Sequence, residues 1–470
     1  MTLTPLERYL AEQGELTAVE QFSQAHARGT TEEVWSSRIP LTRPLPGQQY
    51  AFSVSLDACT GCKACVTACH NVNGLDEGES FRTVGLLTGP TFQQTVTAAC
   101  HHCLDPACLN GCPTNAYEKD ALTGIVAHVE GKCLGCGYCT WTCPYEVPRY
   151  NPARGVVRKC DMCRSRLGAG EEPACVQACP NGAIEIALVD TELVRSEVEG
   201  QALVPTAPPS GITVPTTAYH SDWGLPDDLA PAGATLGGGG RGHDPLVAML
   251  VLTQASAGAL AVDLVLGPRR ATGLLALVLG AVGVAVSILH LGRPERAWRA
   301  AAGLRHSWLS REVAALGLFA VLAVGSVLSA SRLVQGAAAL AGLAGVACSA
   351  MLYVVTRRPS WRASVTGPRF ALGCLVGGSA VAVTSGAGRT AALLLAVSLT
   401  AKLLWEAAAV WRSGPLGRDG LVRYVLGVSA VALAVHGNPL ALVAVLAGEL
   451  VERSRFFTAA GWTGMPGPKR

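Results

Sequence analysis

Eight apolar stretches follow one another in the carboxyl-terminal half of the chain. Most of them reach the roughly 17–25 residues that a helix needs to cross a hydrocarbon layer, where only helices or closed barrels satisfy their own backbone. Buried helices of a soluble protein are the alternative, but eight in succession with Arg-rich connections make it a poor one. The pattern predicts an all-α transmembrane bundle of about eight helices over residues 244–470. The stretches are residues 246–266, 271–291, 312–331, 334–356, 371–387, 390–411, 421–436 and 439–456.

The amino-terminal half has another pattern. Residues 5–27 carry Leu, Val and Phe at helical spacing with charges between them, which predicts an amphipathic helix within an extension over residues 1–49. Over residues 50–199, short β-rich stretches alternate with groups of cysteines, an arrangement typical of ferredoxin hairpins. Residues 200–243 are rich in Pro, Gly, Thr and Ala, and we expect them to form a linker without a core of its own.

Cysteine and charge are distributed unevenly. Sixteen of the eighteen cysteines lie between residues 50 and 190. The start of the chain has early acidic residues and no apolar signal region, so we expect this half to remain in the reducing cytoplasm, where the thiols serve as metal ligands and not as disulfides. The net charge is only +3 and forms no basic patch with interleaved aromatics, which excludes nucleic acid as a partner.

The sixteen cysteines fall into four groups of four. The C-x2-C-x2-C-x3-C spacing and the Cys-Pro endings are typical of bacterial ferredoxins, in which the fourth cysteine of one group binds the cluster of another group. Zinc also accepts four thiolates, but it does not need a third cysteine in the same loop. The spacing therefore favours four [4Fe–4S] clusters. The groups are Cys59, Cys62, Cys65, Cys69; Cys100, Cys103, Cys108, Cys112; Cys133, Cys136, Cys139, Cys143; and Cys160, Cys163, Cys175, Cys179.

Exchange of the fourth ligand pairs the second group with the third and the first with the fourth. The predicted cluster ligands are then Cys100, Cys103, Cys108 with Cys143; Cys133, Cys136, Cys139 with Cys112; Cys59, Cys62, Cys65 with Cys179; and Cys160, Cys163, Cys175 with Cys69. Since protein thiolates fill every such position, these clusters relay electrons and bind no substrate. The fold class is thus an α+β ferredoxin-like iron–sulfur domain followed by the transmembrane bundle.

These motifs resemble a known family. The four groups, with HHCLDPACLNGCP, KCLGC and VRKCDMC around them, resemble the iron–sulfur subunit of dimethyl sulfoxide reductase and its relatives. The stretches HLGRPERAWRA, SWLSREVAALG and GELVERSRFF are similar to the anchor subunit of the same enzymes, so two subunits look fused here. The resemblance implies a separate catalytic subunit with a molybdopterin cofactor, which this chain lacks.

Ionisable residues at membrane depth mark a predicted quinol site. His290 ends the second apolar stretch, Glu312 begins the third, and Arg311 lies beside Glu312. A histidine and a carboxylate suit the oxidation of menaquinol or ubiquinol, which releases protons, and the resemblance places the family's quinol site at these two motif positions. The alternative is structural: Glu312 pairs with Arg311 or Arg293, and His290 bonds a carbonyl.

The basic residues between the apolar stretches predict an orientation. With the amino terminus inside, sixteen Arg and Lys lie on inner connections and the carboxyl-terminal segment and four on outer ones, which places the iron–sulfur domain and both termini on the cytoplasmic side of the inner membrane. Farther along, Lys402 with Glu406 and Glu449 with Arg453 are four residues apart, and we expect each pair to neutralise itself. Cys348 and Cys374 read as apolar filler.

The predicted function is electron transfer between the membrane quinol pool and a molybdopterin oxidoreductase subunit through four clusters. The alternative is a membrane tether for a ferredoxin module that a soluble donor supplies with electrons, without a quinone site. Loss of quinol-dependent reduction on replacement of His290 and Glu312 would distinguish the first from the second.

Overall fold

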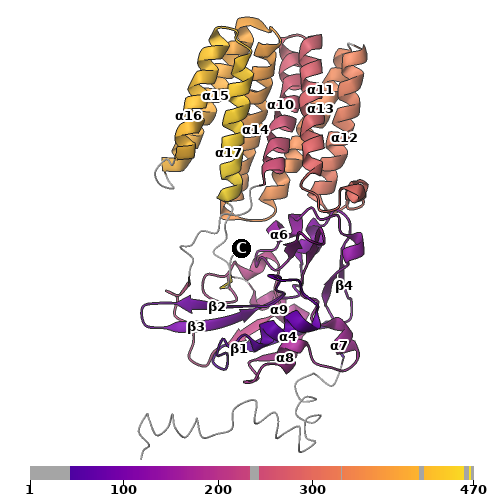
Figure 1. The fold of residues 1–470 in the computed structure, drawn as a ribbon, viewed down its shortest axis with the longest axis vertical. Coiled ribbons are helices and arrows are strands. Elements are labelled where there is room, and N and C mark those ends of the chain that lie inside the picture. The colour runs from indigo at the N-terminus through magenta and orange to yellow at the C-terminus, as the bar shows by residue number, and fades with distance from the viewer. Residues whose placement is uncertain are drawn as a thin grey trace, which may run out of the picture.

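The computed structural model describes residues 43–198, 200–232, 243–329, 331–411, 418–459 and 465–466. A bundle of long helices stands on a smaller region of short strands and helices, and together they form an elongated molecule (Figure 1). The helix expected over residues 5–27 lies outside the described residues.

The lower region is built on two small sheets and two hairpins. In the first sheet, β1 (Gln48–Ser55) pairs antiparallel with β8 (Ile184–Asp190) and parallel with β9 (Ala218–His220). In the second, β2 (Thr83–Thr88) lies between β3 (Gln93–Ala98) and β10 (Ala230–Pro231). The hairpins are β4 (Tyr117–Lys119) with β5 (Val126–His128), and β6 (Arg149–Asn151) with β7 (Val156–Arg158).

Short helices and turns between these strands carry the cysteines. The helices are α4 (Ala64–Val72), α5 (Ala107–Gly111), α6 (Tyr138–Thr142), α7 (Arg164–Gly168), α8 (Ala174–Gln177) and α9 (Thr191–Glu197), with 3-10 turns η1 (Glu130–Lys132) and η2 (Ser210–Ile212). Cysteines also form much of the core, since ten of them are buried among Phe52, Ile184 and similar side chains. The region is α+β and ferredoxin-like, as the alternation of strands and cysteine groups predicts.

The segment expected to be a linker packs on this region along most of its length. Val204 and Leu229 share a core with Leu87 and Val96, and Gln49 donates to the hydroxyl of Thr216 at 3.2 Å. Composition alone predicted a tether because Pro, Gly and Thr dominate it. Its few apolar side chains nevertheless pack against strands of the ferredoxin-like region, and that region therefore includes residues 200–232.

The bundle contains eight described helices. They are α10 (Asp244–Leu266), α11 (Arg270–Ile288), α12 (Trp308–Ser329), α13 (Arg332–Val354), α14 (Ala363–Thr384), α15 (Gly388–Trp411), α16 (Arg418–Val435) and α17 (Leu440–Thr458), with short 3-10 segments η3 (Pro294–Ala301) and η4 (Pro359–Trp361). Six of them, α10 to α15, are long and apolar enough to cross a membrane. The last two are more polar, and Arg423, Glu449, Glu452 and Arg453 among their charged side chains are buried in the bundle.

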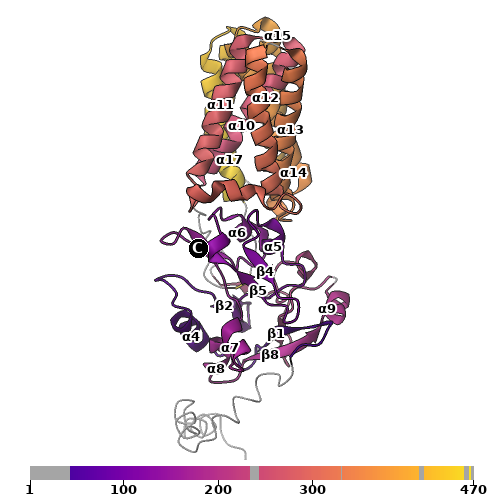
Figure 2. The ribbon, with the colours of Figure 1, turned by 90° about the vertical axis from the view of Figure 1, so that its right-hand side faces the viewer.

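The two regions meet at the base of the bundle, over α5 and α6 (Figure 2). The loop after α11 runs beside the third cysteine group, where the Arg293 amide donates to the carbonyl of Leu134 at 3.0 Å. Gly292 approaches Gly155 so closely that a β-carbon on it would lie 2.2 Å from the Gly155 carbonyl oxygen. Main chain thus packs directly on main chain at this junction.

Candidate electron-transfer site

The structure gathers the sixteen cysteines into four sets of four. The far set (Cys59, Cys62, Cys65, Cys179), the second set (Cys100, Cys103, Cys108, Cys143) and the third set (Cys69, Cys160, Cys163, Cys175) each line one small cavity. In the membrane-side set (Cys112, Cys133, Cys136, Cys139), Cys112 is an electrostatic neighbour of the other three. These are the quartets that ligand exchange between the groups predicts, and as cluster ligands they remain a proposal.

Backbone conformation shapes the loops around these thiols. Gly61 and Gly135 have φ of +75°, a region that residues with a β-carbon rarely adopt, and each leaves the main chain close to its thiols. Backbone amides point at sulfur: Gly135 donates to Cys133 Sγ at 3.4 Å and Ala183 to Cys179 Sγ at 3.2 Å. Such contacts favour a negatively charged sulfur.

The cysteines fit iron–sulfur clusters in their chemistry. None of the eighteen forms a disulfide. Burial raises the pKa of Cys69 and of Cys136 to about 12, so neither thiol would ionise at neutral pH without a bound cation. In the described part of the chain no three His, Cys, Asp or Glu side chains close around a single metal ion.

Two buried cations also fit an anionic group. Arg82 and Lys159 are 2% and 4% exposed, and neither forms an ion pair with a carboxylate among the described residues. Both are neighbours of cysteine sulfurs, and Lys159 Nζ lies 3.5 Å from Cys100 Sγ. Burying a charge without a counter-ion is costly, and a cluster held by four thiolates would supply that counter-ion.

The sets follow one another away from the membrane. Tyr117 is a neighbour of sulfurs in the membrane-side and second sets. Lys159 stands between the second and third sets, and Arg82 between the third and far sets. The resulting order is membrane-side, second, third, far, and Cys62 of the far set is exposed.

A large cavity adjoins the membrane-side set. It has a volume of about 590 Å³ and is lined mainly by apolar side chains of α10 to α13. Its lower wall comes from the ferredoxin-like region and includes Cys136, Tyr138 and Trp141. A cavity of this size and lining is suited to a large apolar ligand, and it reaches the protein around the membrane-side set of thiols.

Two of the three predicted quinol residues line this cavity. Glu312 is 3% exposed, and its Oε1 has no hydrogen-bond partner among the described residues. His290 also lines the cavity, and its Nδ1 bonds the carbonyl oxygen of Ser287. Sequence reasoning missed Tyr138 and Trp141, because they belong to a cysteine loop far from the helices in sequence.

Arg311 lies elsewhere. It does not line the cavity; its guanidinium donates to the carbonyls of Leu304 at 3.1 Å and Arg305 at 2.8 Å and stacks on Trp308. Arg293 donates to the carbonyl of Glu130 at 2.9 Å. In the described residues neither arginine pairs with Glu312, so the ion pair of the structural alternative is not formed, whereas the carbonyl bond that this alternative gives to His290 is present.

The charged residues of α15 to α17 pair differently from the local prediction. Lys402 contacts Glu449 and not Glu406, whereas Arg423 donates to Glu406 at 3.2 Å and to Glu449 at 2.8 Å. Arg453 instead donates to Gln254 of α10 at 3.0 Å. The prediction was wrong because a spacing of four residues considers contacts within one helix only. In the bundle these side chains instead contact residues of neighbouring helices.

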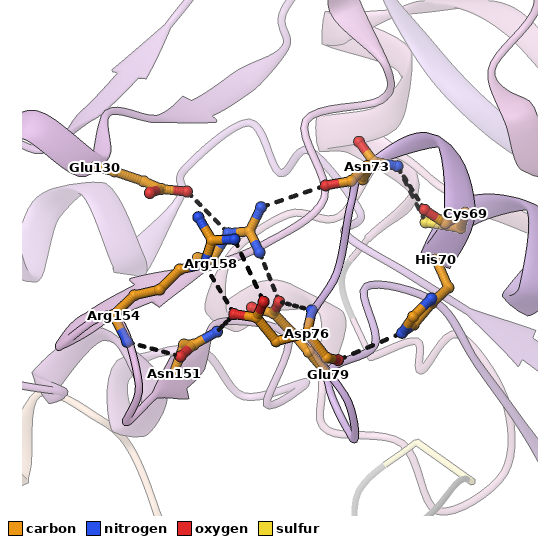
Figure 3. Close-up of polar contacts among 9 residues, drawn as sticks. All are labelled: Cys69, His70, Asn73, Asp76, Glu79, Glu130, Asn151, Arg154 and Arg158. Carbon is orange, nitrogen blue, oxygen red and sulfur yellow. Dashed lines mark hydrogen bonds and ion pairs between the residues drawn. The ribbon is translucent and has the colours of Figure 1, made fainter.

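A second network ties the hairpins together on the outside of the third set (Figure 3). Arg158 donates to Glu79 at 2.6 Å and to Glu130 at 2.8 Å, while Arg154 and Asn151 converge on Asp76. The network joins the segment after α4 to β6 and β7. Through Asn73, which accepts from Arg158 and donates to the carbonyl of Cys69 at 2.8 Å, the network reaches one cysteine of the third set.

Comparison with known proteins covers both regions. The family described as "4Fe-4S dicluster domain" matches residues 91–188, and the family described as "DMSO reductase anchor subunit (DmsC)" matches residues 239–410. A subunit of the anaerobic dimethyl sulfoxide reductase of Haemophilus influenzae is 38% identical over 181 residues, 36% of this chain and 87% of the relative. The corresponding subunit of Escherichia coli K12 is 36% identical over 169 residues, 33% of this chain and 82% of the relative. The thiosulfate reductase electron transfer subunit PhsB of Salmonella typhi is 38% identical over 154 residues, 31% of this chain and 80% of the relative.

Thiol-lined cavities beneath a bundle of membrane-spanning length define a membrane-anchored iron–sulfur electron-transfer protein. Its helical half is of the anchor type found in dimethyl sulfoxide reductases. The chain belongs to the family of the iron–sulfur subunits of dimethyl sulfoxide reductase and carries the anchor in the same polypeptide.

Proposed function

We propose that this chain passes electrons between a membrane quinol pool and a molybdopterin-containing catalytic subunit through four [4Fe–4S] clusters. The observation that supports this most is the shared wall of the large cavity, where Cys136 and the helices of the bundle line the same space. A quinol bound there would lie beside the membrane-side set. Each cluster takes up and releases a single electron, so the sets in sequence form a relay.

Quinol oxidation needs groups for two protons as well as two electrons. Glu312 offers an unpartnered carboxylate oxygen inside the cavity, and His290 offers an imidazole at its edge. We assign to them the binding of the two ring hydroxyls and the acceptance of their protons, with menaquinol or ubiquinol as substrate. Arg311 was predicted with them and has no place in this proposal, because it does not reach the cavity.

The orientation follows from charge. Arg and Lys cluster on the connections that share a side with the ferredoxin-like region, which favours the cytoplasmic face of the inner membrane for that region and both termini. The far set is the end at which we place the catalytic subunit, since Cys62 is exposed there. The relatives include subunits of dimethyl sulfoxide and thiosulfate reductases, and reduction of an acceptor of that kind belongs to the partner.

The test follows cluster reduction in membranes that contain the full chain. Iron and sulfide analysis should give four [4Fe–4S] clusters, and a reduced menaquinone analogue should reduce them. Glu312→Gln and His290→Gln should each slow this reduction by about a hundredfold or more, the range of general-base catalysis, while dithionite still reduces every cluster. Glu295→Gln is the matched control, because that carboxylate is 65% exposed and lies outside the cavity.

The same measurement distinguishes this proposal from a membrane tether without a quinone site. A membrane tether without a quinone site predicts that quinol never reduces the clusters, whereas a soluble reductant does. Quinol reduction that is unchanged in both Gln variants would contradict the assigned roles of Glu312 and His290.

A further inference from the structure

Among the described residues, no carboxylate pairs with the cations between the cysteine sets. Arg82 donates from Nη1 to Thr97 Oγ1 at 3.2 Å and lies 4.7 Å above the ring of Phe52, while its Nε and Nη2 have no hydrogen-bond partner in the described part of the chain. Lys159 donates to the carbonyl oxygens of Val126 and Cys160 and to a sulfur of the second set. Both charges are thus held in place by neutral groups.

The neighbouring residue, Arg158, shows the opposite arrangement. Its guanidinium lies between the carboxylates of Glu79 and Glu130 (Figure 3). Successive side chains of an extended segment point to opposite sides, so Arg158 at the end of β7 faces carboxylates and Lys159 faces sulfur. Of these two adjacent cations, the one that contacts the thiols, Lys159, is the one without a carboxylate partner among the described residues.

The three gaps between sets also differ in charge. The first gap holds Tyr117, which is buried and neutral, whereas the second holds Lys159 and the third holds Arg82. The third set is the one flanked by both of these buried cations. Two other cations lie beside the second set, but Lys119, which donates to the carbonyl of Cys103 at 3.1 Å, is only half-buried, and Arg358 lies 3.6 Å from Glu146. Asp161 lies beside the third set as well, but its side chain is 34% exposed and stands 3.7 Å from Arg164, so solvent and that arginine screen it.

We propose that Arg82 and Lys159 are positioning residues for electron transfer that raise the reduction potential of the third cluster above those of the other three. The inference rests on the proposed binding of four clusters. A cluster held by four thiolates gains one negative charge when it is reduced, and a buried cation nearby stabilises that reduced form in a low-dielectric interior. When an electron moves from the second set to the third, one cluster is oxidised, the other is reduced and no proton is exchanged. At equilibrium, a single electron delivered to the relay would then reside mainly on the third cluster.

The experiment is a redox titration of the full chain monitored by electron paramagnetic resonance, with the third cluster identified by the signal that Cys163→Ser alters. In the unmodified protein the third cluster should titrate at the highest potential of the four. In Arg82→Gln or Lys159→Gln, the ratio of its reduced to oxidised form at a fixed potential should fall at least tenfold, about 59 mV for a one-electron couple. Lys159→Gln should also lower the second cluster, and Arg82→Gln the far cluster.

Charge-conserving variants separate charge from shape. Arg82→Lys and Lys159→Arg should keep the ratio within about threefold of the unmodified protein, about half of the tenfold step on the potential scale. The double variant Arg158→Gln with Glu79→Gln should also stay within that range, because it removes a charge together with its partner. A third cluster that is not the highest of the four overturns the inference, with or without stable variants. Fewer than four clusters in the unmodified protein overturns the proposed function itself, which is a different failure.

Discussion

Buried charge is handled in opposite ways by the two regions of this protein. In the bundle, Lys402 and Arg423 are each in contact with carboxylates from neighbouring helices. In the ferredoxin-like region, Arg82 and Lys159 are equally buried and have no carboxylate partner among the described residues. Hydrocarbon offers a charge no compensation, so the bundle compensates within the polypeptide, whereas the other region leaves its charges to a cofactor.

The comparison also concerns what fills each core. Small and aliphatic side chains pack the helices against one another, as Ala380, Leu395 and Val445 do. In the ferredoxin-like region the cysteines themselves are a large part of the buried apolar surface. Aliphatic side chains fill one core, and thiols that we propose hold metal fill much of the other.

Removal of iron should show the largest difference in stability between the two regions. After oxidation and chelation of the clusters we expect residues 50–190 to unfold, because metal binding and folding are coupled where the ligands form the core, while the helices stay folded. Limited proteolysis should cut within that range and leave a protected fragment that contains the bundle, and circular dichroism should retain the helical signal. A ferredoxin-like region that stays resistant to protease after complete loss of iron would contradict this.

Loss of one bundle cation should have the next largest effect. Lys402→Met leaves Glu449 with Arg423 alone, and breaking a buried pair in this way costs about 3–5 kcal/mol of unfolding free energy. Unfolding in detergent, followed by circular dichroism, measures it. The double variant Lys402→Met with Glu449→Gln should recover part of the loss, and Arg418→Gln, at an exposed position, is the control. A single variant as stable as the unmodified protein would show that the network does not hold α15 to α17.

A methyl group at the junction should have the smallest effect of the three. In Gly292→Ala the new carbon would meet the Gly155 carbonyl oxygen at 2.2 Å, and overpacking of this kind costs about 1–3 kcal/mol. We expect cluster content to be unchanged and reduction by quinol to be slower, since the cavity wall at Cys136 shifts away from the helices. Gly131→Ala is matched to it, because nothing lies within 4 Å of a β-carbon there. Equal quinol reduction rates in both variants would disprove a role for this contact.

Sequence was a good guide wherever structure follows from local spacing. The cysteine spacing predicts the quartets that share cavities, and the apolar stretches predict the eight helices to within a few residues, apart from the start of α14, where Pro368 interrupts the pattern. Both are properties of short windows along the chain.

Sequence failed where contacts join distant segments. The partner of Lys402 lies 47 residues away, and the apolar contacts of residues 200–232 depend on strands that precede them by over a hundred residues. Arg82 and Lys159 were overlooked for the same reason. Lys159 directly precedes Cys160, a signal that the sequence offers, but its isolation from carboxylates exists only in three dimensions.

At the junction, the arginines that follow α11 bind mainly to main-chain oxygen atoms of the ferredoxin-like region. Arg296 and Arg299 both donate to the carbonyl of Gly131 at 3.0 Å, and Arg293 donates to that of Glu130. Because residues 233–242 join the two regions in one polypeptide, each region meets the other at an effective concentration on the order of millimolar. Contacts too weak to assemble two separate polypeptides are then sufficient, and every anchor is made with one relay in a fixed ratio.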